Sequence, residues 1–266
     1  MGEVIVVTSG KGGVGKTTTA ANIGTGLAIN EKKVVLIDTD IGLRNLDVVM
    51  GLENRIVYDL VDVTSGNCRL KQALIKDKRY PNLFLLPAAQ TKDKTAVNPE
   101  QMKELTAELR EEFDYAIIDC PAGIEQGFRN AIAGADRAIV VCMPEVSSVR
   151  DADRIIGLLE AAELRDPKLI INRIRPEMVK RGEMLDQSDV LDILAVGLIG
   201  VIPDDMDVVG FTNRGEPIVA DMKSTKAGEA YRRICRRIQG EDVPFIEWDT
   251  SDGIMSKFLT RFFGKH

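Results

Sequence analysis

A glycine-rich run near the N-terminus holds the residues whose types and spacing point most directly to chemistry. Between Gly10 and Thr17 the sequence matches the pattern G-x-x-x-x-G-K-[ST]. In such a loop, successive backbone N–H groups converge on a polyphosphate at the start of a helix. Lys16 would reach the β- and γ-phosphates, and the hydroxyl of Thr17 would bind Mg²⁺. The run predicts a nucleoside triphosphate site made by Gly10, Lys11, Gly12, Gly13, Val14, Gly15, Lys16, Thr17 and Thr18.

Two later segments place aspartates directly after apolar runs. Asp38 and Asp40 follow one run, and Asp119 follows another, with Gly123 four residues further on. A carboxylate at a strand end can hold a metal-bound water, which is the role we expect for Asp119. Gly123 would let the backbone approach a γ-phosphate closely. For Asp38 and Asp40 the alternative is that each only caps a turn after its strand.

Strand-like and helix-like patterns alternate along the chain. Apolar runs rich in Val, Ile and Leu, without polar alternation, indicate strands buried on both faces. Helical spacing separates the runs, so we expect an α/β fold with a doubly wound, mostly parallel sheet and ligand at the carboxyl ends of its strands. The expected strands are Glu3–Thr8, Lys33–Ile37, Leu83–Leu86, Tyr115–Ile118, Ala138–Cys142, Lys168–Ile171 and Gly197–Ile202, and the clearest helices are Thr18–Asn30, Pro99–Glu112, Val149–Glu163 and Ser224–Ile238.

Composition narrows the possible functions. With 41 acidic and 35 basic residues among 266, the global field does not attract nucleic acid, and no sequence-specific nucleic acid partner is expected. The four cysteines are scattered without a C-x-x-C pair, which argues against a zinc site and a disulfide framework. The only histidine is His266, so histidine-based catalysis is excluded. The N-terminus lacks the pattern of a signal peptide, and no apolar stretch approaches the roughly 18 residues of a spanning helix. We therefore expect a cytoplasmic protein.

The motifs together resemble those of the ParA/MinD ATPases, a P-loop family with a deviant Walker A motif. The matching segments are K-G-G-V-G-K-T-T, D-T-D-I-G-L-R-N-L-D and D-C-P-A-G-I-E, and nearly the whole chain resembles the MinD branch, whose members help to place the bacterial division site. The resemblance implies that Lys11 reaches the phosphates bound by a partner subunit and stabilises charge as the γ-phosphoryl group leaves. Otherwise Lys11 is a solvated surface lysine.

The same resemblance implies roles at the strand ends. Asp40 would orient the attacking water, with Asp38 in support. The amide of Asn172 and backbone near Pro203 and Asp205 would hold adenine, since an amide pairs with both donor and acceptor edges of a base. Plain strand-end turns are the alternative. Related iron–sulfur ATPases place cysteines near Cys120, but the surrounding motif is that of the non-redox branch.

The C-terminal residues form a distinct pattern. We expect an ATPase domain over residues 1–240, a flexible tether over 241–253 and an amphipathic helix over 254–266. A basic amphipathic segment with large aromatic residues is typical of an interfacial membrane anchor. Docking on the domain's own core is the alternative. The apolar face comprises Ile254, Met255, Phe258, Leu259, Phe262 and Phe263.

The MinD resemblance implies an ATPase that uses ATP and Mg²⁺ and forms a homodimer when ATP is bound. It would attach reversibly to the cytoplasmic face of the cell membrane, on an anionic surface. It would recruit the division inhibitor MinC, with MinE or a topological factor as its regulator. A ParA-type DNA segregation ATPase, a flagellar-number ATPase, a metabolic P-loop ligase or kinase and a non-hydrolysing scaffold are the alternatives.

Overall fold

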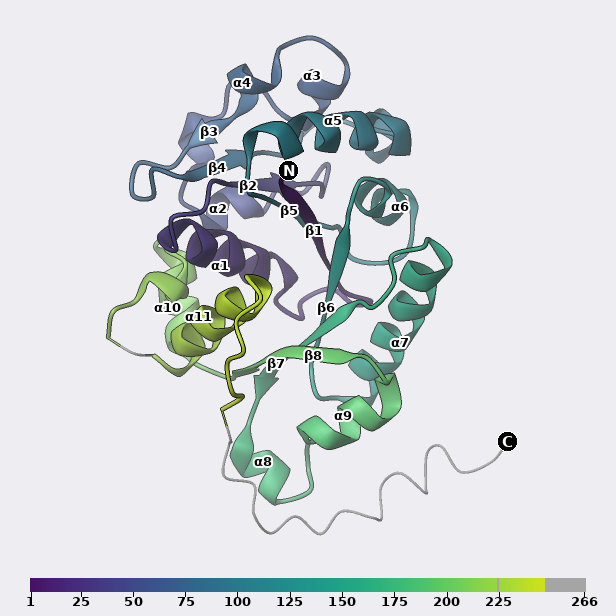
Figure 1. Cartoon of the computed structure of the whole chain (residues 1–266), viewed down its shortest axis with the longest axis vertical. Coiled ribbons are helices and arrows are strands. Elements are labelled where there is room, and N and C mark those ends of the chain that lie inside the picture. Colours follow the sequence, from purple (N-terminus) through teal and green to yellow (C-terminus); the bar gives the residue numbers. More distant parts are fainter. Residues whose placement is uncertain (224, 247–266) are drawn as a thin grey trace.

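The computed structural model describes residues 1–223 and 225–246, and its core is one eight-stranded sheet (Figure 1). The strand order is β3-β4-β2-β5-β1-β6-β7-β8, and every neighbouring pair is parallel except β3 with β4. The strands are β1 (Glu3–Thr8), β2 (Val34–Asp38), β3 (Ile75–Lys76), β4 (Leu83–Leu86), β5 (Tyr115–Asp119), β6 (Arg137–Cys142), β7 (Lys168–Ile174) and β8 (Gly197–Pro203).

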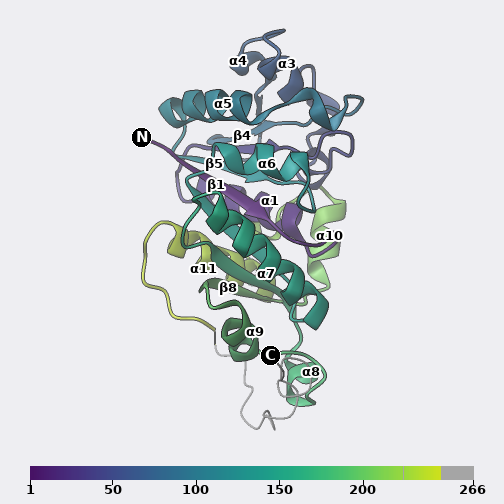
Figure 2. The same cartoon turned by 90° about the vertical axis from the view of Figure 1, so that its right-hand side faces the viewer.

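Helices cover both faces of the sheet, as the continuous apolar strands require. On one face lie α5, α6, α7 and α9, and on the other lie α1, α10 and α11 (Figures 1 and 2). The helices are α1 (Lys16–Ile29), α2 (Leu46–Val49), α3 (Leu60–Thr64), α4 (Leu70–Ala73), α5 (Pro99–Glu112), α6 (Gln126–Ala133), α7 (Val146–Ala161), α8 (Pro176–Lys180), α9 (Gln187–Leu194), α10 (Asp207–Asn213) and α11 (Lys226–Ile238), with 3₁₀ turns η1 (Glu53–Arg55), η2 (Lys94–Ala96) and η3 (Ile218–Ala220).

Each face has its own buried cluster, because alternate residues of one strand point to opposite sides. In β1, Val4 and Val6 join the cluster under α5 and α7, while Ile5 and Val7 join the cluster under α1 and α11. The predicted fold class, a doubly wound and mostly parallel α/β sheet, is confirmed.

The connections around β1 create the site. The chain leaves β1 through α1 to β2 on one side, and leaves β5 through α6 to β6 on the other side. The order of strands therefore reverses at β1, and such a switch point opens a crevice outside the carboxyl ends of the strands. The loop Gly10–Thr17 lies at this point.

Residues 241–246, the first part of the expected tether, lie against α11. Arg237 donates to the backbone oxygens of Val243 (2.9 Å) and Pro244 (2.9 Å), and Arg236 pairs with Glu241 at 2.7 Å. The side chain of Val243 is buried. The rest of the expected tether and the whole expected amphipathic helix, residues 247–266, lie outside the described residues.

Candidate functional site: the carboxyl end of the sheet

Parallel register brings the acidic residues together. Asp38 is the register partner of Asp119 on the adjacent strand, and Val7 is the partner of Asp119 on its other side. Neighbouring strands lie about 4.8 Å apart, so Asp119 on β5 lies beside the start of the loop that follows β1, and Asp38 on β2 lies one strand further away. Asp38 and Asp119 are both buried. Two acids that are far apart in the sequence thus lie on adjacent strands, at the edge of the sheet that carries the phosphate loop.

The loop conformation depends on its glycines. Gly13 and Gly15 have φ values of 78° and 92°, in the left-handed region that favours glycine. A Cβ on Gly10 would lie 2.3 Å from the backbone oxygen of Asp151 in α7, so this position also needs glycine. Val14 is buried and anchors the loop in the core. At Gly12 and Gly13 an added Cβ would meet nothing within 4 Å, so the loop opens onto free space there.

Lys16 and Asp119 form a buried ion pair under the loop. Lys16 Nζ donates to Asp119 Oδ1 at 2.9 Å, and the two side chains are 9% and 1% exposed. Burial lowers the pKa of Lys16, but Asp119 outweighs this effect and raises it above its ordinary value. Burial raises the pKa of Asp119, against the opposing charge of Lys16. The short Nζ–Oδ1 distance favours an ionised Asp119 paired with a charged Lys16.

Asp38 acts on the backbone of the segment that follows it. Its carboxylate accepts from the N–H groups of Asp40 (2.9 Å), Asn45 (3.2 Å) and Leu46 (3.1 Å). Burial first, and then the charge of Asp119, raise the pKa of Asp38 to about 7. This geometry fits the supporting role predicted for Asp38, since it shapes the turn that carries Asp40.

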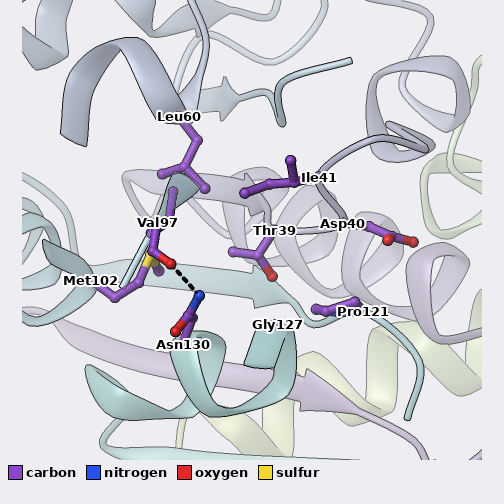
Figure 3. A pocket seen from close by; sticks show the side chains of 9 residues that line it. All are labelled: Thr39, Asp40, Ile41, Leu60, Val97, Met102, Pro121, Gly127 and Asn130. Atoms are coloured by element: carbon purple, nitrogen blue, oxygen red, sulfur yellow. Dashed lines mark hydrogen bonds between the residues drawn. The ribbon is translucent and has the colours of Figure 1, made fainter. Parts of the chain in front are cut away.

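Asp40 itself is half-buried, and within the described part of the chain its side chain makes no hydrogen bond. Figure 3 shows its carboxylate pointing away from a small cavity behind the two acidic loops. That cavity has a volume of only about 10 Å³, roughly the space of one water molecule, and its walls include Ile41, Leu60 and Met102. The cavity is therefore packing space and not the nucleotide site.

Sequence reasoning overlooked Thr39, between the two aspartates. Its hydroxyl donates to the backbone oxygen of Asp119 at 2.7 Å, and its N–H donates to the same oxygen at 3.1 Å. Thr39 thus fastens the turn with Asp40 to the end of β5. Its position between two acids after a strand was the only sequence signal, and it does not specify a cross-strand contact.

The remaining loop positions also lie at this edge. Thr17 and Thr18 are half-buried residues in the first turn of α1, and Gly123 has a φ of 95° in the β5–α6 loop. Lys11 is exposed, with Nζ 3.4 Å from the hydroxyl of Ser147 in its own chain. Cys120 is buried, and burial raises the pKa of its thiol to about 12. In residues 1–223 and 225–246, no cluster of His, Cys, Asp or Glu forms a ready-made metal site.

The predicted base-binding residues have local partners. Asn172 Nδ2 donates to the carbonyl of Val14 at 2.7 Å, so Asn172 supports the phosphate loop. Asp205 accepts from the N–H groups of Asp207 (3.0 Å) and Ala227 (3.2 Å) and thereby joins its loop to α11. Pro203 ends β8 beside β7. All three lie near the carboxyl edge, on the β7–β8 side of the loop.

The expected membrane-binding residues, from Ile254 to Phe263, lie outside the described residues. Among the described helices, none has the length and apolar composition needed to cross a bilayer.

Comparison with known proteins identifies the family. Residues 2–171 match the profile of a family described as AAA domain. The chain is 60% identical over 267 residues to the septum site-determining protein MinD of Bacillus subtilis (strain 168), covering 99% of both chains. The fold matches MinD from the MinC:MinD cell division protein complex of Aquifex aeolicus with a TM-score of 0.86 and 53% identity, covering 92% of this chain and 99% of the other.

A more distant relative has the same fold. The septum site-determining protein MinD of Pyrococcus horikoshii OT3, solved in complex with Mg-ADP, matches with a TM-score of 0.82 and 29% identity, covering 90% of this chain and 96% of the other. The similarity extends over nearly the full length of the chain, and it agrees with the glycine loop after β1 and the acidic strand ends. The chain belongs to the MinD family of septum site-determining P-loop proteins.

Proposed function

We propose that the chain is a Mg²⁺-dependent ATPase whose ATP-bound form is a homodimer on the membrane. The observation that carries the proposal is the Lys16–Asp119 pair, buried beneath a glycine loop that opens onto free space. A polyphosphate with Mg²⁺ supplies what this pair lacks, an anion for Lys16 and a hydrated cation for Asp119. Thr17 would hold the metal directly, and Asp119 would hold it through water. Bound Mg²⁺ would neutralise charge on the phosphates.

Hydrolysis would depend on Asp40 and Lys11. The side chain of Asp40 lies at the same edge as the loop, points away from the packing cavity and makes no hydrogen bond among the described residues. We assign it to orienting the attacking water. An Asp40→Ala variant should therefore keep the ATP dimer and lose turnover. A normal hydrolysis rate in that variant would leave Asp40 with only a turn-capping role.

Lys11 would act across the dimer, because its exposed ammonium group is not held within the nucleotide loop of its own subunit. Lys11→Ala should still bind ATP but fail to complete the dimer. Titration with a fluorescent nucleotide and size-exclusion chromatography measure the two properties separately. A normal ATP dimer of Lys11→Ala would contradict the role in trans.

Membrane attachment would come from residues 254–266. Burial of the six apolar side chains of this segment gains roughly 1.5–3 kcal/mol each. Ordering the segment costs roughly 1 kcal/mol or more per residue for backbone alone. One segment should thus bind weakly, and two on a dimer should bind well through effective concentration. We therefore propose that the protein attaches reversibly to the cytoplasmic face of the membrane.

The partners follow from the relatives. The Aquifex aeolicus structure is of a MinC:MinD cell division protein complex, which supports a MinC-type division inhibitor as partner of this chain. We propose that the membrane-bound dimer recruits that inhibitor and that MinE or a topological factor controls its release. The role in septum placement is favoured over a flagellar or DNA segregation role by the 60% identity to a septum site-determining protein.

Sedimentation with anionic liposomes tests the proposal, using ADP, ATP and a non-hydrolysable ATP analogue. Protein should pellet with ATP and the analogue and remain in the supernatant with ADP. Replacing both Phe262 and Phe263 by Glu should abolish pelleting while ATP binding and dimerisation persist, because like charges then face the headgroups. Equal pelleting with ADP and ATP would refute the nucleotide switch. A loss of thermal stability comparable to a core substitution would show that the segment packs on its own domain.

A further inference from the structure

The segment that follows α11, residues 241–246, is held against the domain, and we call it the strap. Gly240 has a φ of 86° and ends the helix in the left-handed region, and the N–H of Glu241 donates to the carbonyl of Arg236 at 3.1 Å. Further along, the side chain of Val243 is buried. A polar, proline-containing sequence has little tendency to order by itself. The strap therefore takes its place from contacts with the rest of the domain.

Most of these contacts come from Arg237, in the last turn of α11. Its Nε donates to the carbonyl of Val243 at 2.9 Å, and its Nη2 donates to the carbonyl of Pro244 at 2.9 Å. Its Nη1 donates to the carbonyl of Ile199 in β8 at 2.9 Å. The ring centroid of Phe245 lies 3.9 Å from the guanidinium carbon. One side chain thus joins α11, the edge strand β8 and the strap, which follows α11 in yellow in Figure 1.

The contacts of Arg237 differ from those of the arginine one turn before it. Arg233 forms an ion pair with Glu229 at 2.8 Å and adds one hydrogen bond to the strap, to the carbonyl of Pro244 at 3.1 Å. Among the described residues Arg237 forms no ion pair, and its hydrogen bonds all go to backbone oxygens. Hydrogen bonds from a charged donor are stronger than those between neutral groups. The guanidinium of Arg237 is therefore used to hold backbone, chiefly that of the strap.

The strap shortens the tether that the sequence predicts over residues 241–253. That tether would have 13 residues, of which the strap takes 6, so that 7 are left in residues 247–253. The effective concentration of a group on a flexible tether falls roughly as the −3/2 power of the tether length. A tether of 7 residues in place of 13 should therefore raise the effective concentration about 2.5-fold. In a dimer this factor applies to the second membrane segment once the first has bound.

We propose that Arg237 is a positioning residue for membrane attachment. It fixes the strap at the edge of the sheet, so that the membrane segment starts from residue 247 on a short tether. This proposal rests on the proposed binding of residues 254–266 to the membrane. Ile199 lies near the amino end of β8, away from the carboxyl edge that carries the nucleotide loop. Release of the strap should therefore weaken membrane binding and leave ATP binding and dimerisation unchanged.

Titration with vesicles of equal parts phosphatidylglycerol and phosphatidylcholine tests the proposal, in the presence of Mg²⁺ and a non-hydrolysable ATP analogue. Arg237→Gln removes the charged hydrogen bonds and the ring contact, and its vesicle affinity should fall about 2- to 3-fold. A second variant keeps every strap contact and adds about six Gly and Ser residues after Ile246, which should lower the affinity by the same factor. Arg181→Gln, at an exposed arginine paired with Glu183, is the matched control for the loss of a positive charge and should bind like the wild type.

A long insertion separates tether length from every other effect of Arg237. With about 24 Gly and Ser residues added after Ile246, the tether has about 31 residues in the wild type and about 37 in Arg237→Gln. The vesicle affinities of these two proteins should then differ by only about 1.3-fold. A role in charge or in stability alone would keep the full difference, and that result would overturn the proposal.

Release of the strap can also be measured without a membrane. Trp248 is the only tryptophan and lies two residues after the strap. Its fluorescence anisotropy should be lower in Arg237→Gln than in the wild type, because the chain before it is no longer held. Unchanged anisotropy, or vesicle affinity equal to that of the wild type, would overturn the role of Arg237. A wild-type protein that does not bind vesicles with the analogue would refute the proposed membrane attachment itself, whatever the variants do.

Discussion

The two ends of the central sheet differ in how deeply their charged side chains are buried. At the carboxyl end, Asp38 and Asp119 are buried on adjacent strands, and Lys16 pairs with Asp119. At the amino end, Asp136 accepts from the N–H of Val4 and from Arg110, which pairs with it at 2.9 Å. The Asp136 side chain is 41% exposed. The same strands thus carry crowded, buried charge at one end and paired, hydrated charge at the other.

This difference indicates which end is built for binding and which for stability. Ion pairs between exposed side chains are screened by water. They contribute little to stability, and forming them costs little. Buried carboxylates pay a desolvation penalty and repel each other, so their free energy falls when a cation or a phosphate-bound metal arrives. The carboxyl end therefore gives up stability in the nucleotide-free protein. Substitutions at the carboxyl end should therefore change both nucleotide affinity and stability. Substitutions at the amino end should change stability only, and by less.

The largest effect is expected for Lys16→Met. Methionine keeps much of the volume but leaves Asp119 buried without its partner, which costs on the order of 3 kcal/mol of unfolding free energy. ATP affinity should fall on the order of 100-fold, because a charge-assisted contact to phosphate is lost. Urea unfolding and nucleotide titration measure the two effects. ATP affinity close to that of the wild type would show that Lys16 serves only the ion pair.

A smaller effect, visible in its pH dependence, is expected for Asp38→Asn. The pKa of Asp38 rises from its ordinary value of 3.8 to about 7 on folding, mainly through burial. The folded state thus binds the proton more tightly than the unfolded state. The stability from this group is fully present below about pH 4 and is lost as pH rises through about 7, a few kcal/mol in all. The variant should remove this decline.

Urea unfolding of the nucleotide-free protein from about pH 5.5 to 8 tests the slope. The slope and not the absolute stability is decisive, because an amide offers one oxygen to three backbone N–H groups. Asp136→Asn, at the amino end of the sheet, is the matched control and should keep the wild-type slope. His266 is present in all three proteins, so it does not change the comparison of their slopes. An unchanged slope in Asp38→Asn would show that the buried Asp38 does not cause the loss of stability with rising pH.

A more modest effect is expected for Arg110→Ala. The substitution removes the pair with Asp136 and the hydrogen bond to the carbonyl of Gly134 at 2.7 Å. The cost should be about 1–2 kcal/mol, because the arginine side chain is only 17% exposed. Thermal unfolding should show the loss, and ATP affinity should not change. A change in ATP affinity would mean that the two ends of the sheet are coupled.

The smallest effect is expected for Glu3→Gln, also at the amino end. Glu3 pairs with Arg137 at 3.1 Å, and each side chain is about one-third exposed. Such pairs are worth about 0.2–1 kcal/mol, so the unfolding free energy should change by less than about 1 kcal/mol. A double-mutant cycle with Arg137→Gln measures the pair itself. A coupling energy as large as the loss of unfolding free energy expected for Lys16→Met would show that ion pairs at the two ends of the sheet contribute equally to stability.

Much of the fold was predictable from the sequence. The runs Glu3–Thr8, Leu83–Leu86 and Pro99–Glu112 have the predicted bounds, because apolar continuity and a proline-initiated helix are local signals. The two-residue strand β3 was missed. It pairs antiparallel with β4 at the sheet edge and is too short to have a period. The prediction that α1 begins at Thr18 was two residues late, since helical hydrogen bonding starts within the loop at Lys16.

The site was predictable as a set of residues but not as a set of contacts. The glycine pattern and the strand-end acids identified the residues that meet at the carboxyl edge. The pairing of Lys16 with Asp119 and the bond from Thr39 to β5 join segments about eighty to a hundred residues apart. The strand register creates these contacts, and no local pattern encodes it. The contacts of residues 241–246 with α11 were not predicted either. A polar, proline-containing sequence is typical of a free linker, and no local pattern indicates such contacts.

A crystal structure with Mg²⁺ and a non-hydrolysable ATP analogue would show whether the Lys16–Asp119 pair opens when nucleotide binds. Lys16 Nζ lies 2.9 Å from Asp119 Oδ1 in the structure described above. With the analogue bound, we expect Lys16 to leave Asp119 for the β- and γ-phosphates, and the hydroxyl of Thr17 and a water held by Asp119 to bind the metal. A structure with the analogue bound while Lys16 remains on Asp119 would contradict this expectation.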